Sequence, residues 1–300
     1  MVGRFLDYVE IKTKITSTFA FMMAMAYLFY VDQEVQWLPT MVFFSSMFLF
    51  DLTTTAINNY IDSKTNDQKL QFEKDTAKRI IMVLLAISSV LGLYLAYLTD
   101  IVVLLIGSLC FLCGVLYTYG PVPISRQPLG EIISGFFYGF FIPFLVLYIN
   151  MPEGTYISLG LSLETLYIQL EIMPMFSVIL LSVAPFCTTA NIMLANNICD
   201  VEKDILAKRY TLPYYLGNRS LQVFSGLYYI TYIATTLMVI MKILSPICLA
   251  ALLNLYFVKR NISLFQEKQH KESTFIVSIK NYVIIMGTNT LLIFISGFLG

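Results

Sequence analysis

Long apolar stretches, separated by short polar segments, run along the whole chain. Most match the length that a helix needs to cross a bilayer, about 17 to 25 residues, and they contain almost no charge. We therefore predict an all-α, polytopic membrane protein whose residues 1–300 form a single domain, with nine transmembrane helices in one bundle. The predicted spans are residues 15–31, 40–57, 80–98, 101–118, 130–149, 174–196, 221–240, 243–258 and 281–299.

Only Thr99 and Asp100 separate the third and fourth predicted spans. A single helix over residues 80–118 would be about 60 Å long, roughly twice the thickness of the hydrocarbon layer. This segment is therefore predicted to be a helical hairpin. The eighth stretch is short and has Pro246 in its first turn.

The composition supports a membrane protein. Of the 300 residues, 58% are hydrophobic and 13% are charged, and the mean hydropathy is +0.74. A soluble domain has roughly 25% charged residues, so this class is excluded. The lipid bilayer is an expected partner, and a nucleic acid is not.

The basic residues fall on one side of the predicted bundle. With nine spans and a cytoplasmic N-terminus, every Lys and Arg except Lys242 lies in a cytoplasmic segment. This is the asymmetry that the positive-inside rule describes. It predicts a multi-pass protein of the plasma membrane with a cytoplasmic N-terminus and an outer C-terminus.

Two polar segments, Asn58–Asp67 and Asn196–Asp204, align without a gap. Positions 58, 62 and 66 of the first correspond to 196, 200 and 204 of the second, and residues four apart share a helical face. Each segment follows an apolar run and ends at the cytoplasmic side. We therefore expect each half of the bundle to contribute one polar helix end to a central cavity that opens to the cytoplasm.

The acids in these segments suggest a magnesium site. Carboxylates at the membrane boundary are costly to desolvate unless they face a polar cavity, a partner or a metal. Magnesium takes oxygen ligands, typically one or two carboxylates together with substrate phosphates. The segments, with basic residues beside them, thus predict a magnesium-bridged diphosphate site, although a solvated helix end or a loop ion pair is the alternative for any single acid. The candidate metal ligands are Asp62, Asn66, Asp67, Asp200 and Asp204, of which Asp62 and Asp200 are the catalytic pair. The candidate substrate contacts are Asn58, Asn196, Lys69, Arg126, Lys208, Arg209 and Tyr119.

Three further residues have two interpretations each. Asp51 lies two turns deeper than Asn58 on the same helical face, and it either lines the cavity or has a hydrogen-bonded structural role. Tyr117 and Tyr119, near the end of the fourth span, either shield a carbocation with their ring faces or are ordinary interfacial aromatics.

The paired segments, the nine spans and the basic cytoplasmic loops resemble the UbiA superfamily of intramembrane prenyltransferases. The second motif of its dihydroxynaphthoate branch is similar to Asn196–Asp200, Asp204 and Lys208–Leu212 of this chain. The loop between helices 4 and 5 of that branch is similar to Gly120–Glu131. The resemblance implies magnesium-dependent transfer of a polyprenyl group from a polyprenyl diphosphate to an aromatic acceptor. For this branch the acceptor is 1,4-dihydroxy-2-naphthoate, which loses CO2 and gives demethylmenaquinone.

The chain departs from the family pattern in three places. Asn59 stands where Asp is usual, Cys199 stands where the branch generally has Arg, and in Asn66-Asp67 the acid is displaced by one position. The first and third departures concern the metal ligands of the first segment, and the second concerns the choice of acceptor.

Other functions share some of these features. A different aromatic acceptor, such as 4-hydroxybenzoate, fits the same metal site. An ion-coupled transporter also has intramembrane acids and two halves, but its charges usually lie near the midplane with broken helices. A CDP-alcohol phosphotransferase needs a D-x-x-D-G stretch, which this chain lacks.

Overall fold

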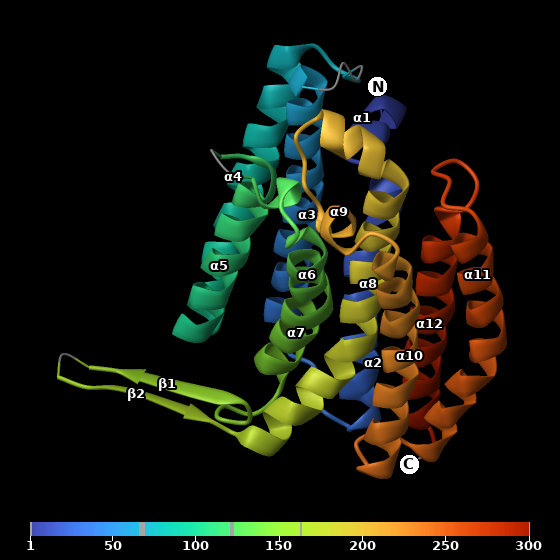
Figure 1. The fold of residues 1–300 in the computed structure, drawn as a ribbon. Helices are drawn as coiled ribbons and strands as arrows, with labels where there is room; N and C mark the ends of the chain where they lie inside the picture. The colour runs from blue at the N-terminus through green and yellow to red at the C-terminus, as the bar shows by residue number, and fades with distance from the viewer. Residues whose placement is uncertain (1, 66–69, 121–122, 163, 300) are drawn as a thin grey trace. The chain divides into compact units, whose positions relative to one another are not determined.

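The structure is a computed structural model of the 300-residue chain, and it describes residues 2–65, 70–120, 123–162 and 164–299. It is almost entirely helical (Figure 1). Within this described part, eight helices are long and apolar enough to cross a membrane. The remaining predicted span, residues 15–31, is the first along the chain. It is the helix α2 (Ile15–Tyr30), which has 16 residues and is shorter than the others. Each predicted span thus coincides with a helix, whereas the prediction that all nine cross the membrane stays a prediction.

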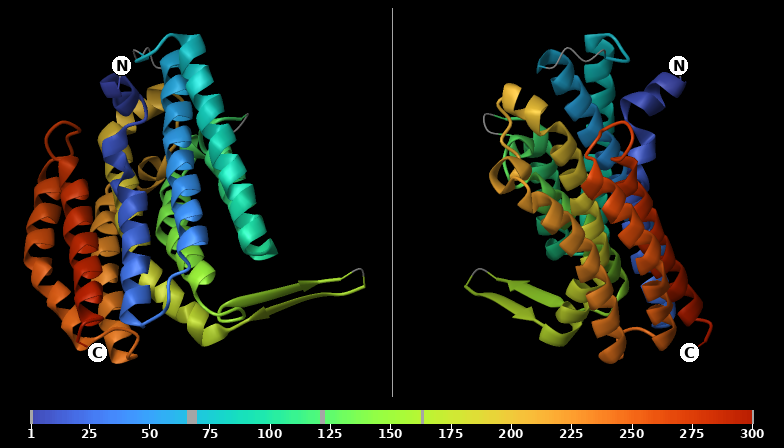
Figure 2. Two further views of the ribbon diagram at one scale, coloured as in Figure 1. Left: turned by 180° about the vertical axis from the view of Figure 1, so that it is seen from behind. Right: turned by 45° about the vertical axis from the view of Figure 1, so that its right-hand side comes forward.

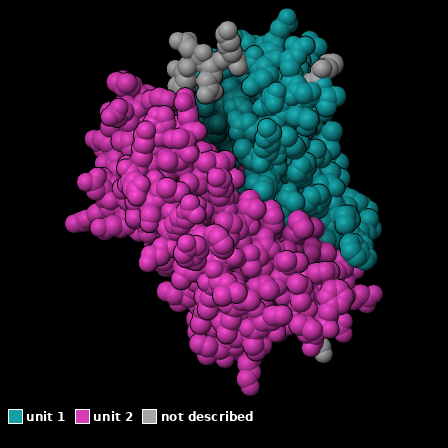
Figure 3. Space-filling model, turned by 90° about the vertical axis from the view of Figure 1, so that its right-hand side faces the viewer, with its two compact units in different colours: residues 1–18, 36–125 teal, residues 19–35, 126–300 magenta. Residues whose placement is uncertain are grey.

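The described residues divide into two compact units, coloured separately in Figure 3. The first unit comprises residues 1–18 and 36–125, and the second comprises residues 19–35 and 126–300. The prediction of one domain over residues 1–300 stays a prediction, and each unit is described below by itself.

The first unit is built on three long helices. They are α3 (Trp37–Thr65), α4 (Lys74–Leu98) and α5 (Ile101–Thr118), preceded by α1 (Val2–Tyr8) and the 3-10 helix η1 (Ile11–Lys14). The predicted hairpin is present, because a methyl group on Gly92 of α4 would lie 3.7 Å from the Phe111 ring of α5. Asp100 accepts hydrogen bonds from the backbone N–H groups of Val102 and Val103 and so caps the start of α5.

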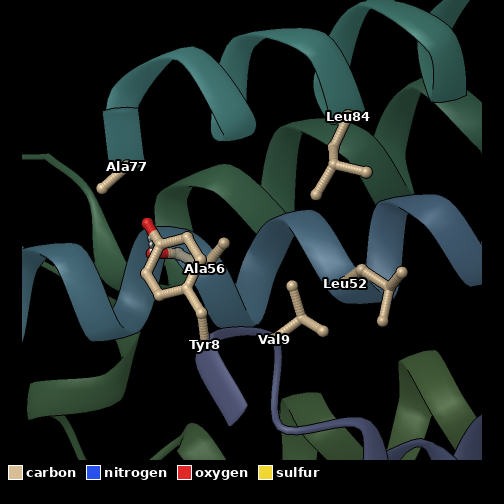
Figure 4. Packing of buried hydrophobic residues seen from close by; sticks show 6 residues of the cluster. All are labelled: Tyr8, Val9, Leu52, Ala56, Ala77 and Leu84. Atoms are coloured by element: carbon tan, nitrogen blue, oxygen red, sulfur yellow. Dashed lines mark hydrogen bonds between the residues drawn. The ribbon is translucent and has the colours of Figure 1, made fainter. Parts of the chain in front are cut away.

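A small apolar cluster joins the N-terminal segment of the first unit to α3 and α4 (Figure 4). The Tyr8 hydroxyl donates a hydrogen bond to the Ala56 carbonyl over 3.0 Å, which satisfies the only polar atom of a fully buried ring. The buried members of the cluster are Tyr8, Val9, Leu52, Ala56, Ala77 and Leu84.

Asp51 has a structural role in the first unit. The Lys14 and Asp51 side chains are 4% and 5% exposed, and Lys14 Nζ lies 2.8 Å from Asp51 Oδ1. The Ser17 hydroxyl donates to Asp51 Oδ2 over 2.7 Å, and Lys14 Nζ also contacts Thr55 Oγ1. Both carboxylate oxygens therefore have partners, and the ion pair joins η1 to α3.

The second unit is arranged around α8 (Ile172–Leu206), the most enclosed of the candidate spans. It also contains the second part of α2. One candidate span, Gly130–Asn150, consists of α6 (Gly130–Ser134), the π-helical segment η3 (Gly135–Phe141) and α7 (Ile142–Asn150). Gly139 is required here, because a methyl group at its Cα would lie 2.2 Å from the Phe186 backbone of α8. The remaining helices are α9 (Leu212–Leu216), α10 (Arg219–Ile240), the 3-10 helix η4 (Pro246–Asn254), α11 (Leu255–Glu267) and α12 (Ile276–Ser296).

The predicted all-α, polytopic fold class is confirmed. The loop over residues 150–173 adds a local feature that the sequence analysis did not predict. This segment contains an antiparallel hairpin of β1 (Ile157–Leu161) and β2 (Leu166–Leu170), which pair from Ile157 with Leu170 to Leu161 with Leu166. Its alternation of apolar and polar residues has the period of a strand, which a search for long apolar runs does not detect.

Candidate active site

The first polar segment lies at the end of α3. Asn58 Oδ1 accepts a hydrogen bond from the Thr118 hydroxyl of α5 over 3.4 Å. Asp62, one turn further along, is half-buried. Three predicted site residues, Asn66, Asp67 and Lys69, lie outside the described residues, so their roles remain predictions.

The hydrogen bonds of Asn59 explain why this chain has Asn where the family usually has Asp. Asn59 Nδ2 donates to the Tyr8 carbonyl over 2.9 Å and to Glu10 Oε1 over 3.1 Å. An aspartate at position 59 has no proton to donate at neutral pH, and its charge would lie beside that of Glu10. The amide at this position therefore connects α3 to the N-terminal segment.

The second polar segment lies near the end of α8, where two of its oxygens share one cation. Lys271 Nζ contacts both Asn196 Oδ1 and Asp200 Oδ2. Since Asn196 and Asp200 are four residues apart on one helix, their side chains reach the same point from successive turns, as the spacing predicts. The Asp200 side chain is 19% exposed, so the pair is accessible.

Sequence reasoning did not assign Lys271 to the site. It lies between α11 and α12, at the same end of the second unit as the last turns of α8 (Figures 1 and 2). A tight turn positions it, in which the His270 carbonyl accepts from the backbone N–H of Thr274 over 2.9 Å. The Phe275 ring lies 5.4 Å from Lys271 Nζ. No motif or spacing in the sequence relates this loop to Asp200, and the tertiary fold alone brings them together.

Asp204 lies one turn beyond Asp200 and has its own basic partner. Its Oδ1 is 3.6 Å from Arg209 Nε, and its Oδ2 accepts a long hydrogen bond, 3.5 Å, from the Thr211 hydroxyl. The Arg209 backbone N–H also donates to the Asp204 carbonyl over 2.8 Å. Asp204 is 7% exposed, so in this structure it serves as the anchor of the loop that follows α8.

That loop brings a third basic residue to the same region. The backbone N–H of Tyr210 donates to the Arg126 carbonyl over 3.0 Å, so Arg126 lies beside the loop that carries Arg209. Lys208 is exposed in a left-handed backbone conformation, and Tyr119 is 64% exposed at the end of α5. Side-chain contacts thus join Asn196 and Asp200 to Lys271, and Asp204 to Arg209. The side-chain positions of Lys208, Arg126 and Tyr119 near this site stay predictions.

Glu131 is a second residue that sequence reasoning did not assign to the site. Its carboxylate is buried at 3% exposure, and its Oε1 accepts a hydrogen bond of 2.8 Å from Asn197 Nδ2. Oε2 has no hydrogen-bond partner among the described residues. Asn197 is therefore held by α6, while its neighbour Asn196 faces Lys271.

The donor atoms of α8 suit a hard cation. Among the described residues, no three His, Cys, Asp or Glu side chains come together as a metal cluster. Asn196 and Asp200 nevertheless each direct one oxygen at the Lys271 ammonium. This ammonium takes the place that a bound metal cation would have. Magnesium typically needs only one or two carboxylates when phosphate oxygens complete its shell, so these residues fit it.

Comparisons with known proteins identify the family of this chain. Residues 18–280 match the UbiA prenyltransferase family. The chain is 24% identical over 232 residues to 1,4-dihydroxy-2-naphthoate octaprenyltransferase from Bacillus subtilis (strain 168), covering 73% of this chain and 68% of that protein.

Two solved structures have a similar fold. One is described as digeranylgeranylglyceryl phosphate synthase in membranes, with a TM-score of 0.67, 19% identity, and coverage of 100% of this chain and 99% of that chain. The other is a UbiA homologue from Archaeoglobus fulgidus bound to DMAPP and Mg2+, with a TM-score of 0.61, 15% identity, and coverage of 99% and 98%. The chain therefore belongs to the UbiA prenyltransferase family and is an intramembrane prenyltransferase.

Proposed function

We propose that this protein transfers a polyprenyl group from a polyprenyl diphosphate to 1,4-dihydroxy-2-naphthoate, with loss of CO2 and release of diphosphate. The reaction depends on magnesium and gives demethylmenaquinol, the reduced form of demethylmenaquinone. The observation that carries the metal-dependent step is the convergence of Asn196 and Asp200 on one positive charge. The naphthoate acceptor is supported by the name of the Bacillus subtilis relative and by the motifs of that branch in this chain. Membership of a prenyltransferase family decides against an ion-coupled transporter.

The two polar segments hold the metal in this proposal. Asp62 and Asp200 are the principal carboxylates, and Asp204 and either Asn66 or Asp67 are further ligands. Bound magnesium neutralises charge on the diphosphate as it leaves, which lowers the barrier to breaking the C–O bond of the allylic substrate.

Basic side chains bind the remaining phosphate charge. Lys271 contacts Asp200 and Arg209 lies beside Asp204 in the structure. Arg126, Lys208 and Lys69 join them in this proposal. Asn58 and Asn196 donate from their amide groups. Because five cations surround one dianionic or trianionic group, diphosphate is retained when the prenyl group departs.

The prenyl cation then needs a dry environment and a nucleophile. The apolar helices exclude water that would otherwise react with the cation, and Tyr119 presents a ring face to it. The acceptor carbon that carries the carboxylate forms the new C–C bond. As CO2 leaves, the electron pair of the broken C–C bond returns to the ring, so no proton is removed from that carbon.

The orientation in the membrane belongs to the same proposal. The distribution of Lys and Arg supports a cytoplasmic N-terminus, cytoplasmic site loops and an outer C-terminus in the plasma membrane. A soluble polyprenyl diphosphate head group and a soluble aromatic acid would then both reach the site from the cytoplasm.

An acceptor panel tests the proposed reaction. Purified protein is incubated with magnesium and a radiolabelled prenyl diphosphate, together with dihydroxynaphthoate, 4-hydroxybenzoate or homogentisate. We expect a prenylated, decarboxylated product only with dihydroxynaphthoate, and none when EDTA removes magnesium. A product with 4-hydroxybenzoate alone would replace the acceptor, and magnesium-independent turnover would contradict the metal site.

Lys271→Met is expected to raise the KM for prenyl diphosphate by about tenfold or more. The reason is the loss of one charge-assisted hydrogen bond to the diphosphate, which is worth roughly 1.5 to 3 kcal/mol. Lys268→Met is the matched control, because Lys268 lies in the same loop and is exposed. Steady-state kinetics at saturating acceptor measure both variants. Equal KM values in the two would show that Lys271 does not bind the substrate.

A further inference from the structure

The β1–β2 hairpin has one apolar and one polar face. Side chains alternate along each strand, and the register pairs apolar with apolar and polar with polar residues. On one face, Ile157 pairs with Leu170 and Leu159 with Ile168, and Leu166 follows in the same row. The opposite face carries Ser158, Gly160, Tyr167 and Gln169.

The polar face is closed by Tyr167. Its ring lies so close over Gly160 that a methyl group on Gly160 would be 1.9 Å from the ring. Glycine therefore lets the ring lie across the neighbouring strand. The Gln169 side chain donates to Glu171 Oε1 over 2.8 Å, which adds a further polar contact beside β2.

The apolar face is uncovered along β2, while Ile157 and Leu159 of β1 are half-buried. Leu166 and Ile168 are each 61% exposed, and Leu170 is 50% exposed. A two-stranded hairpin is at best marginally stable in water, and aliphatic side chains that stay exposed add no hydrophobic stabilisation. A partner that accepts aliphatic side chains along one flat face would stabilise it.

The position of the hairpin in the second unit identifies that partner. It joins the end of α7 at Asn150 to the start of α8 at Ile172, and both helices belong to candidate membrane spans. Figures 1 and 2 show that the hairpin leaves these helix ends sideways, across the direction of the helices rather than along it. Since helix ends mark the boundary of the hydrocarbon layer, the hairpin runs along the membrane surface.

Exposed apolar residues continue from the hairpin onto the start of α8. Ile172, Met173 and Phe176 follow directly after β2 in the chain and are exposed on the first turns of α8. The acids Glu153, Glu164 and Glu171 lie near the base and tip of the hairpin, and the segment contains no Lys or Arg. The aliphatic side chains, and not an attraction to anionic lipid, are thus the means of binding.

We infer that the hairpin lies flat at the membrane–water interface on the outer side of the plasma membrane. Its apolar face, Ile157, Leu159, Leu166, Ile168 and Leu170, lies against the acyl chains, and Tyr167 points toward water. The hairpin lies on the hydrocarbon rather than inside it, because the outer edges of both strands have backbone groups that need water or lipid head groups as partners. The hairpin is then an anchor for the start of α8, the helix that carries Asn196 and Asp200 near its other end.

Single tryptophans on the two faces test this inference. Trp37 is the only tryptophan, so Trp37→Phe gives a background into which Ile168→Trp or Gln169→Trp is introduced. The two positions are adjacent in sequence and face opposite ways. Phe176→Trp, in the candidate span of α8, is the positive control for contact with lipid.

Each variant is reconstituted into phosphatidylcholine vesicles whose acyl chains are brominated, and quenching of its fluorescence is measured. We expect Ile168→Trp to be quenched several-fold more than Gln169→Trp and to approach Phe176→Trp, while iodide in the buffer quenches Gln169→Trp more. Equal quenching of the two hairpin variants by brominated lipid would overturn the inference. So would protection of Ile168→Trp from both quenchers, which would mean that protein, such as a second copy of the chain, covers the face.

Discussion

Asp200→Ala is expected to lower kcat/KM for prenyl transfer by roughly 10³-fold or more. Removal of one group that stabilises developing charge typically reduces a rate by 10²- to 10³-fold, and loss of a metal ligand adds to this. Asp200 is the carboxylate that, with Asn196, faces the shared cation in the second unit. Initial rates measured over a range of magnesium concentrations report the effect, because a weakened metal site also shifts the magnesium dependence.

Glu202→Ala is the matched control for this variant. Glu202 is an exposed acid two residues further along α8, so its side chain points away from the face of Asp200. We expect its activity to stay within about twofold of the natural protein. Asp62→Ala is expected to match Asp200→Ala, since both segments hold metal in the proposed function. Near-normal turnover of either aspartate variant, in protein that remains inserted and folded, would contradict the two-segment metal site.

Lys14→Met is expected to have the largest effect on stability, about 3 to 5 kcal/mol, because it leaves the buried Asp51 carboxylate without its cation. The ammonium group contacts Asp51 Oδ1 over 2.8 Å and the Asp51 carbonyl over 3.0 Å, so one substitution removes both contacts. Thermal unfolding in detergent, followed by fluorescence, should show a decrease of roughly 5 to 15 °C in the apparent Tm.

Two further variants separate the ion pair from the loss of charge alone. Lys12→Met removes an exposed lysine from the same 3-10 helix and should leave the Tm nearly unchanged. Lys14→Met combined with Asp51→Leu should recover most of the lost stability, because apolar residues often replace a buried ion pair without a large penalty. If Lys14→Met melts at the same temperature as Lys12→Met, the pair contributes nothing to stability. If the double variant is stable but inactive, Asp51 belongs to the reaction after all.

The sequence predicts those parts of the site that are local. Helical periodicity relates Asn196 to Asp200 and Asp200 to Asp204, and the structure keeps each relation along α8. The family resemblance, confirmed by the match over residues 18–280, has the same origin, because its motifs are short stretches of consecutive positions. The departure at Asn59 is also visible in the sequence, but its reason, the hydrogen bonds to Tyr8 and Glu10, is not.

Contacts between distant segments are the part that periodicity does not encode. Asp51 has two readings in the sequence, and only its contact with Lys14 in the structure distinguishes them. Lys271 and Glu131 reach the second polar segment from other loops and helices, so no spacing along the chain predicts their partners.

The sequence by itself thus determined the membrane class, the positions of the helices and the polar face of each segment, because hydrophobic burial in lipid and the 3.6-residue repeat act over neighbouring residues. Only the tertiary structure decided which cation faces Asp200, which lysine neutralises Asp51, and that the loop over residues 150–173 forms an amphipathic hairpin. The physical reason is that ion pairs and strand register depend on how the chain folds back on itself, and side chains far apart in sequence meet only then.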